Sequence, residues 1–135
     1  MEFSFLTLYI CRLFHQNYYM QAKSNPLKEK SFQFALDIIE FTQKLNESRN
    51  YVVSKQLTKS GTSVGANIHE AQTPESKNDF VHKLKIAAKE ASETEFWLML
   101  CKESPYLPDP GLLSGKVNEL QRILSASISS CKSRD

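Results

Sequence analysis

Residues 80–101 read FVHKLKIAAKEASETEFWLMLC, and this stretch decides the fold. Its apolar and small residues recur at alternating steps of four and three positions: Phe80, Leu84, Ala87, Ala91, Thr94, Leu98 and Cys101. This spacing lines one face of an α-helix and is typical of helices packed in left-handed bundles. The stretch therefore predicts a long bundle helix, which ends at Ser104–Pro105 because a helical conformation is disfavoured before proline.

Two segments before this helix repeat its periodicity. One series consists of Leu27, Phe34, Ile38, Phe41 and Leu45, and the next of Val53, Leu57, Ser60, Val64, Asn67 and Ala71. The first helix is expected from about Pro26 to Glu47, since proline suits a first helical turn. The second is expected to follow the turn-like residues 46–50 and to end at Thr73–Pro74.

The last periodic series consists of Leu113, Val117, Leu120, Leu124 and Ile128. It follows the proline-rich residues 105–111, and Asp109 or Ser114 is a candidate cap for its helix. Four amphipathic helices with short connections predict an all-α, antiparallel up-and-down four-helix bundle. We assign residues 20–135 to this one domain, in keeping with a chain of 135 residues and 15.4 kDa.

Small residues mark the places where helices should approach closely. Gly61 and Gly65 interrupt the second helix, although a glycine in a helix interior costs about 1 kcal/mol relative to alanine. We assign both glycines, and Ala87 and Ala91 of the third helix, to helix packing. Asn67 falls near the core side of the second helix, where a buried amide needs a hydrogen-bonding partner and could fix the register of the helices.

Overall charge and cysteine content narrow the function only a little. The formal net charge is +2 and the isoelectric point is about 8.4, so any nucleic-acid binding must come from local patterning. Cys11, Cys101 and Cys131 are odd in number and include no CxxC pair. They indicate neither a disulfide framework nor a zinc site, and they favour a reducing cytoplasm.

Residues 1–19 differ from the rest of the chain in being mostly apolar. Their acidic start at Glu2 does not suit a secretory signal, and Arg12 and His15 interrupt a run too short for a membrane helix. We therefore expect no membrane partner. We interpret residues 1–19 as a non-native or disordered leader before a start at Met20, and the alternative is an extra element that caps an oligomer surface.

The sequence gives little support to catalysis or metal binding. Glu70, Glu90 and Glu93 suggest a carboxylate-bridged metal site, but a di-iron bundle needs two Glu-x-x-His pairs and this chain has none. The hydroxyl residues 60–63 lack the glycine-flanked turn of a nucleophilic serine, and residues 61–65 do not form a P-loop. We predict a protein that is not an enzyme and that holds no metal or cofactor.

The third helix carries more apolar surface than one core face can use. Three of its apolar residues lie about 120° or more from the core face at 100° per residue, namely Ile86, Trp97 and Leu100. A monomer would leave Trp97 largely exposed, and exposed apolar patches commonly mark association sites. We therefore expect this face to form an interface between subunits.

Charged residues complete the predicted surface. Glu90 and Glu93 lie on the flank of the third helix away from its core face. We assign them to the same oligomer interface, paired with lysines of their own helix or of a neighbouring chain. Arg49, Lys55 and Lys59 form a basic stripe along the second helix, and an oligomer would repeat it. Contacts to backbone phosphates add through counterion release, so the stripe predicts nucleic-acid binding. The alternative is that these cations only solvate a helix face.

Beyond these patterns, the chain resembles a known family over roughly residues 27–130. The resemblance rests on Ser54-Lys-Gln-Leu57, on residues 59–71, and on Ser76, Asp79, Phe80, Lys83, Leu84, Ile86, Ala87, Lys89, Glu90, Ala91, Glu93, Thr94, Trp97 and Leu98. In these residues the chain resembles the four helix bundle protein family, which was first noticed as reading frames inside intervening sequences of 23S ribosomal RNA genes. Arginine and tyrosine usually occupy the family positions where Lys59 and Phe96 stand here.

The resemblance implies partners but no enzymatic activity. Family members look like homopentamers of up-and-down bundles, and a relative, the accessory variability protein of diversity-generating retroelements, binds nucleic acid and a reverse transcriptase. For this chain the resemblance implies a homopentamer that binds RNA or DNA, beside a reverse transcriptase or another nucleic-acid enzyme. The competing hypothesis is a structural module that assembles with proteins and binds no nucleic acid.

Overall fold

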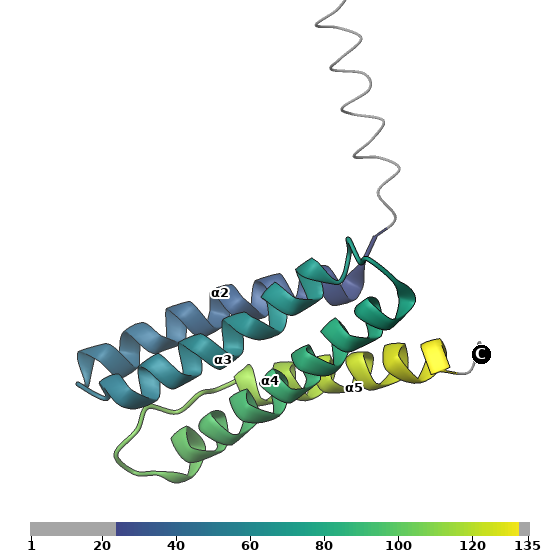
Figure 1. The fold of residues 1–135 in the computed structure, drawn as a ribbon. Helices are drawn as coiled ribbons and strands as arrows, with labels where there is room; N and C mark the ends of the chain where they lie inside the picture. Colours follow the sequence, from purple (N-terminus) through teal and green to yellow (C-terminus); the bar gives the residue numbers. More distant parts are fainter. Residues whose placement is uncertain (1–23, 133–135) are drawn as a thin grey trace, which may run out of the picture.

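The structure is a computed structural model that describes residues 24–132, and four helices lie along this part of the chain (Figure 1). They are α2 (Pro26–Glu47), α3 (Tyr51–Glu70), α4 (Lys77–Glu103) and α5 (Leu113–Lys132). The predicted all-α four-helix fold is confirmed. None of the four described helices is long and apolar enough to cross a membrane. The interpretation of residues 1–19 falls outside the described residues.

The four helices stand at the corners of one bundle. Each helix packs against the next in antiparallel fashion, and α5 returns beside α2 to close the bundle (Figure 1). Within residues 24–132 the diagonal pairs, α2 with α4 and α3 with α5, have no Cα atoms within 8 Å of each other. Each helix therefore shares two sides with neighbours and turns a third side outward.

Local sequence sets the starts of α2 and α4. The Asn25 side chain accepts a hydrogen bond from the amide of Lys28 at 3.1 Å, and Pro26 takes the first helical position. The Ser76 hydroxyl accepts one from the amide of Asp79 at 3.0 Å. Each cap satisfies an amide that the first turn of a helix leaves without a partner.

The expected caps of the last helix are wrong. Because α5 begins at Leu113, Ser114 lies inside the helix and does not cap it. Asp109 closes a turn of the connector instead, where its carboxylate accepts a hydrogen bond from the amide of Gly111 at 2.7 Å. Gly111 has a φ of 57°, a conformation that glycine adopts without a steric penalty.

The core contains large side chains from all four helices: Phe34, Ile38, Leu45, Leu57, Ile68, Leu84, Leu98, Leu120 and Leu124. The alternating series of α4 forms part of it, with Leu84, Ala87, Ala91, Thr94, Leu98 and Cys101 all buried. Burial raises the pKa of the Cys101 thiol to about 11, so this thiol stays protonated at neutral pH and acts as a packing residue.

Candidate nucleic-acid interface and apolar faces

The two glycines of α3 lie against α2. A Cβ added at Gly61 would stand 2.8 Å from Cγ1 of Ile38, and one added at Gly65 would stand 3.1 Å from the carbonyl oxygen of Ser31. Both distances are shorter than the separation of about 3.5–4.0 Å that non-bonded atoms prefer. The absence of a side chain at these positions therefore lets α2 and α3 approach closely.

A buried polar pair joins α3 to α4. The hydroxyls of Ser60 and Thr94 are hydrogen-bonded at 3.0 Å, and Thr94 also donates to the carbonyl of Glu90 at 2.7 Å. Ala87 and Ala91 are fully buried on the same helix as Thr94. Because buried hydroxyls need partners, this pair favours one alignment of α3 along α4.

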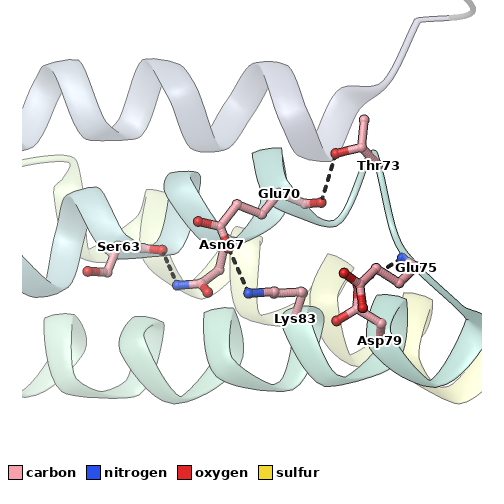
Figure 2. Close-up of polar contacts among 7 residues, drawn as sticks. All are labelled: Ser63, Asn67, Glu70, Thr73, Glu75, Asp79 and Lys83. Carbon is pink, nitrogen blue, oxygen red and sulfur yellow. Dashed lines mark hydrogen bonds and ion pairs between the residues drawn. The ribbon is translucent and has the colours of Figure 1, made fainter.

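Other polar groups of α3 bond to the backbone of their own helix. The Thr62 hydroxyl donates to the carbonyl of Thr58 at 2.6 Å. The Asn67 amide donates to the carbonyl of Ser63 at 2.8 Å, and Asn67 is only half-buried (Figure 2). Asn67 therefore does not make the register-fixing contact between helices that its place in the sequence suggested, because the backbone one turn earlier satisfies its amide.

The carboxylates considered for a metal site do not converge. Glu70 accepts a hydrogen bond from Nζ of Lys83 at 2.7 Å, which joins α3 to α4 and raises the pKa of Lys83 (Figure 2). Glu93 accepts one from the indole of Trp97 at 3.5 Å. Within residues 24–132, neither Glu90 nor Glu93 forms an ion pair, and no three His, Cys, Asp or Glu side chains are grouped to hold a metal ion.

The basic stripe is open to solvent. Arg49, Lys55 and Lys59 are all exposed, and within the described part of the chain none of them is paired with a carboxylate. Residues 48–69 contain no Asp or Glu at all. Lys55 and Lys59 are four residues apart in one helix, so their side chains stand together on one face.

An exposed aromatic residue accompanies this stripe, and sequence reasoning missed it. Tyr51 is the first residue of α3 and is 61% exposed. It follows Arg49 by two positions and precedes Lys55 by one turn. Arg49 itself lies in the turn between α2 and α3 rather than on α3, with a φ of 62° in the left-handed region. The sequence signal that could have revealed it was a tyrosine between two cations. Tyr51 was overlooked because it lies outside the periodic core series.

The exposed apolar face of α4 differs from the predicted one. Leu100 is exposed, but Ile86 and Trp97 are half-buried, and Trp97 packs against the core. The expectation of a largely exposed Trp97 is wrong, because so large a side chain reaches back to the core from the edge of its face. Phe96 and Met99 are exposed instead, at 53% and 56%. The Phe96 ring stands edge-on to Trp97, with centroids 5.3 Å apart.

A second exposed apolar face lies on α2 and was not predicted. Phe32, Leu36 and Ile39 recur at steps of four and three and are exposed by 67%, 45% and 44%. Beside Phe32, a groove of about 920 Å³ runs between α2 and α3. The groove is also lined by Ala35, Thr62, Gly65, Ala66 and His69. The spacing of these three residues was visible in the sequence. It was missed because the core series of α2 already explained why this helix is rich in apolar residues.

Comparisons with known proteins identify the family. The model of the 23S rRNA-intervening sequence protein family matches residues 23–126. The chain belongs to this family. A crystal structure of a protein of unknown function from the S23 ribosomal protein family of Bacteroides thetaiotaomicron VPI-5482 is 41% identical in sequence, with a TM-score of 0.72. That match covers 76% of this chain and 97% of the other. A comparison with curated proteins finds no match.

Proposed function

We propose that this member of the 23S rRNA-intervening sequence protein family is a non-catalytic, self-assembling bundle that binds structured RNA or DNA. Binding would use the basic stripe of Arg49, Lys55 and Lys59. The observation that carries the proposal is that all three side chains are exposed and, among the described residues, unpaired. Cations that are not already neutralised by a carboxylate are free to replace the counterions of a phosphate backbone.

Self-assembly would make this small site effective. A chain with a net charge of +2 has little attraction for nucleic acid as a monomer. The exposed apolar residues of α2 and α4 support assembly, since soluble monomers rarely expose contiguous apolar patches larger than a few hundred Å². A homopentamer, the assembly that the family resemblance implies, would present Lys55 and Lys59 once per subunit.

Tyr51 suggests which nucleic acids would bind best. Stacking of an unpaired base on an aromatic side chain contributes about 1–3 kcal/mol per base, whereas the bases of a duplex are already stacked. Tyr51 is exposed at the start of α3, one helical turn before Lys55, so the two side chains share a face of the helix. We therefore expect structured RNA with unpaired loops to bind more tightly than fully paired DNA of equal length.

The other parts of the proposal concern partners and compartment. A protein that binds RNA or DNA without acting on it would work beside a nucleic-acid enzyme, such as a reverse transcriptase. The thiols of Cys101 and Cys131 are free, which suits a reducing cytoplasm.

The test is a charge reversal with a matched control. Lys55→Glu with Lys59→Glu removes the stripe, and Lys85→Glu with Lys89→Glu makes the same change in charge and spacing on α4, where both lysines are exposed. Electrophoretic mobility shifts would be measured with hairpin RNA and duplex DNA at two salt concentrations. We expect the first variant alone to lose binding, with both variants folded by circular dichroism.

The salt dependence gives a second reading of the same experiment. The logarithm of the affinity should fall linearly with the logarithm of salt concentration, by about 0.9 per phosphate contacted on duplex DNA and about 0.7 on single strands. Equal loss in both variants would show attraction by net charge rather than by the stripe. If the wild type shifts neither ligand at low salt, the alternative of a protein-only interaction module is favoured, which the exposed apolar faces also suit.

A further inference from the structure

We infer that the α2–α3 groove is one half of an interface between two copies of this chain, and that the other half is the patch of Phe96, Met99 and Leu100 on α4. The groove is the surface formed by Phe32, Ala35, Thr62, Gly65, Ala66 and His69. The inference rests on the self-association in the proposed function. It adds which surfaces meet and that the contact joins unlike faces.

The groove has the size and chemistry of a surface that receives apolar side chains. Its volume of about 920 Å³ is at the upper end of that of pockets for drug-sized ligands. Ala35, Gly65 and Ala66 occupy little of the space between the two helices. Phe32 lines the same groove and is 67% exposed, so most of its apolar surface is left uncovered by the described residues.

The patch on α4 supplies the opposite shape. Phe96, Met99 and Leu100 are three large side chains within five consecutive residues, and they are exposed by 53%, 56% and 39%. Large side chains of one helix that enter a space left by small ones of another are the usual contact between packed helices. The same chain thus carries a hollow lined by small residues and a ridge of large ones.

One copy cannot bring its own groove and patch together. The groove opens between α2 and α3, whereas the patch lies on an exposed side of α4, and no Cα atom of α2 lies within 8 Å of one in α4. A second copy can fill the groove with its patch, and this leaves its own groove open for a third. Contacts between unlike faces continue in this way, as a ring where the rotation between copies closes and as a filament where it does not. A groove-to-groove pair would instead leave both α4 patches exposed.

The charges at the rims of the two surfaces fit each other. Lys28 and Glu29 border the groove, and Lys102 and Glu103 follow the patch at the end of α4. Within the described residues none of these four side chains is in an ion pair. Docking that sets Lys28 against Glu103 and Glu29 against Lys102 would pair all four. A rim with no excess positive charge does not suit nucleic acid, which favours a second copy as the occupant.

The test uses two variants that each damage one half of the interface. Ala66→Arg fills the groove from an exposed position, and Phe96→Glu with Leu100→Glu charges the patch. Asn118→Arg is the control for an added cation at an exposed site of α5. Masses would be measured by light scattering and native mass spectrometry at micromolar concentration, with folding checked by circular dichroism. If Ala66→Arg fails to fold, Phe32→Glu replaces it.

The decisive measurement is a mixture of the two damaged variants. We expect wild type and Asn118→Arg to be oligomers and each damaged variant alone to be a monomer. An equimolar mixture should give a 1:1 dimer, because one intact groove and one intact patch remain between the two chains. A monomeric wild type, a patch variant that still assembles, or folded variants that do not combine would each overturn the inference. No nucleic acid is present, so failure to bind RNA or DNA leaves this result unaffected.

Discussion

α2 meets its two neighbours in different ways. Toward α3, the backbones approach so closely that a single Cβ at Gly65 would stand 3.1 Å from the carbonyl oxygen of Ser31. Toward α5, two ion pairs join the helices: the exposed Lys30 with the exposed Glu119 at 2.9 Å, and the half-buried Asp37 with the exposed Lys116 at 2.5 Å. The first contact is between packed atoms, and the second is between charged groups at or near the surface.

We call these two helix–helix contacts the α2–α3 seam and the α2–α5 seam, and they should respond differently to mutation. Atoms in a packed seam have no room to move, so an added side chain displaces backbone and typically costs about 1–3 kcal/mol. Exposed ion pairs contribute about 0–1 kcal/mol because water and salt screen them. If the α2–α3 seam dominates the stability of the bundle, substitutions there should have the largest effect and those between α2 and α5 the smallest.

The largest effect is expected from Gly65→Leu. The new side chain would force α2 and α3 apart, lowering the free energy of unfolding by about 1–3 kcal/mol or more, despite a better helix propensity. Urea and thermal denaturation would measure the loss. Gly115→Leu on α5 is the control, because a Cβ there has nothing within 4 Å. If Gly65→Leu melts at or above the temperature of the wild type, glycine is not needed at this position for the close approach of α2 and α3.

A smaller loss is expected at the seam between α3 and α4. Thr94→Val removes the hydroxyl that bonds to Ser60, leaving a buried hydroxyl without this partner and lowering the free energy of unfolding by about 1 kcal/mol. The double variant Thr94→Val with Ser60→Ala should recover part of the loss. A double-mutant cycle, with denaturation of the wild type, the two single variants and the double variant, would measure this. Strictly additive effects would mean that the two hydroxyls are not coupled.

A gain in stability is expected at the turn that joins α2 to α3. Arg49 holds a φ of 62°, which costs a residue with a Cβ about 1–2 kcal/mol. Arg49→Gly relieves this penalty at some cost in chain entropy, so we expect a net gain of about 0.5–1 kcal/mol in chemical denaturation. Arg49→Lys keeps both charge and strain and should be neutral. A loss on Arg49→Gly would show that the arginine side chain stabilises the turn.

The smallest effect is expected at the seam between α2 and α5. Burial acts to raise the pKa of Asp37, but hydrogen bonds from Lys116 and Gln33 outweigh it, and the pKa lies below its ordinary value. The carboxylate therefore stabilises the fold above the pKa it has in the unfolded chain, and this contribution is lost as pH falls through the lower folded value.

Asp37→Asn tests this contribution directly. We expect it to lower the free energy of unfolding at pH 7 by about 0.5 kcal/mol, since Lys116 is 44% exposed, and the difference from wild type should shrink at low pH and in high salt. Denaturation curves at several pH values would show both trends. A loss at pH 7 as large as that of Gly65→Leu would reverse the ranking of the two seams.

Much of the fold was predictable because its signals are local. The steps of four and three along α4, the Asn25–Pro26 start of α2 and the proline after Ser104 each act within a few residues. The candidate site was predictable only in part. Exposure of Lys55 and Lys59 follows from their position off the core series, but nothing local shows whether a carboxylate from another helix comes near them.

The errors in the candidate site have a common physical cause. Trp97 lies off the core face of α4 by helical geometry, yet its length lets it pack against the core. Phe32, Leu36 and Ile39 follow a bundle-like spacing, yet they face away from the bundle. Periodicity predicts which side chains share a face of a helix, but it does not predict whether another helix covers that face.

The sequence by itself determined the number of helices, their approximate bounds and the residues that form the core, because these depend on spacing and capping along one chain. Only the tertiary structure decided which sides of α2 and α4 stay uncovered, how close α3 comes to α2, and that Glu70 pairs with Lys83 rather than with the basic stripe. These features depend on distances between helices. Side chains far apart in sequence set those distances together, so no single segment contains the information.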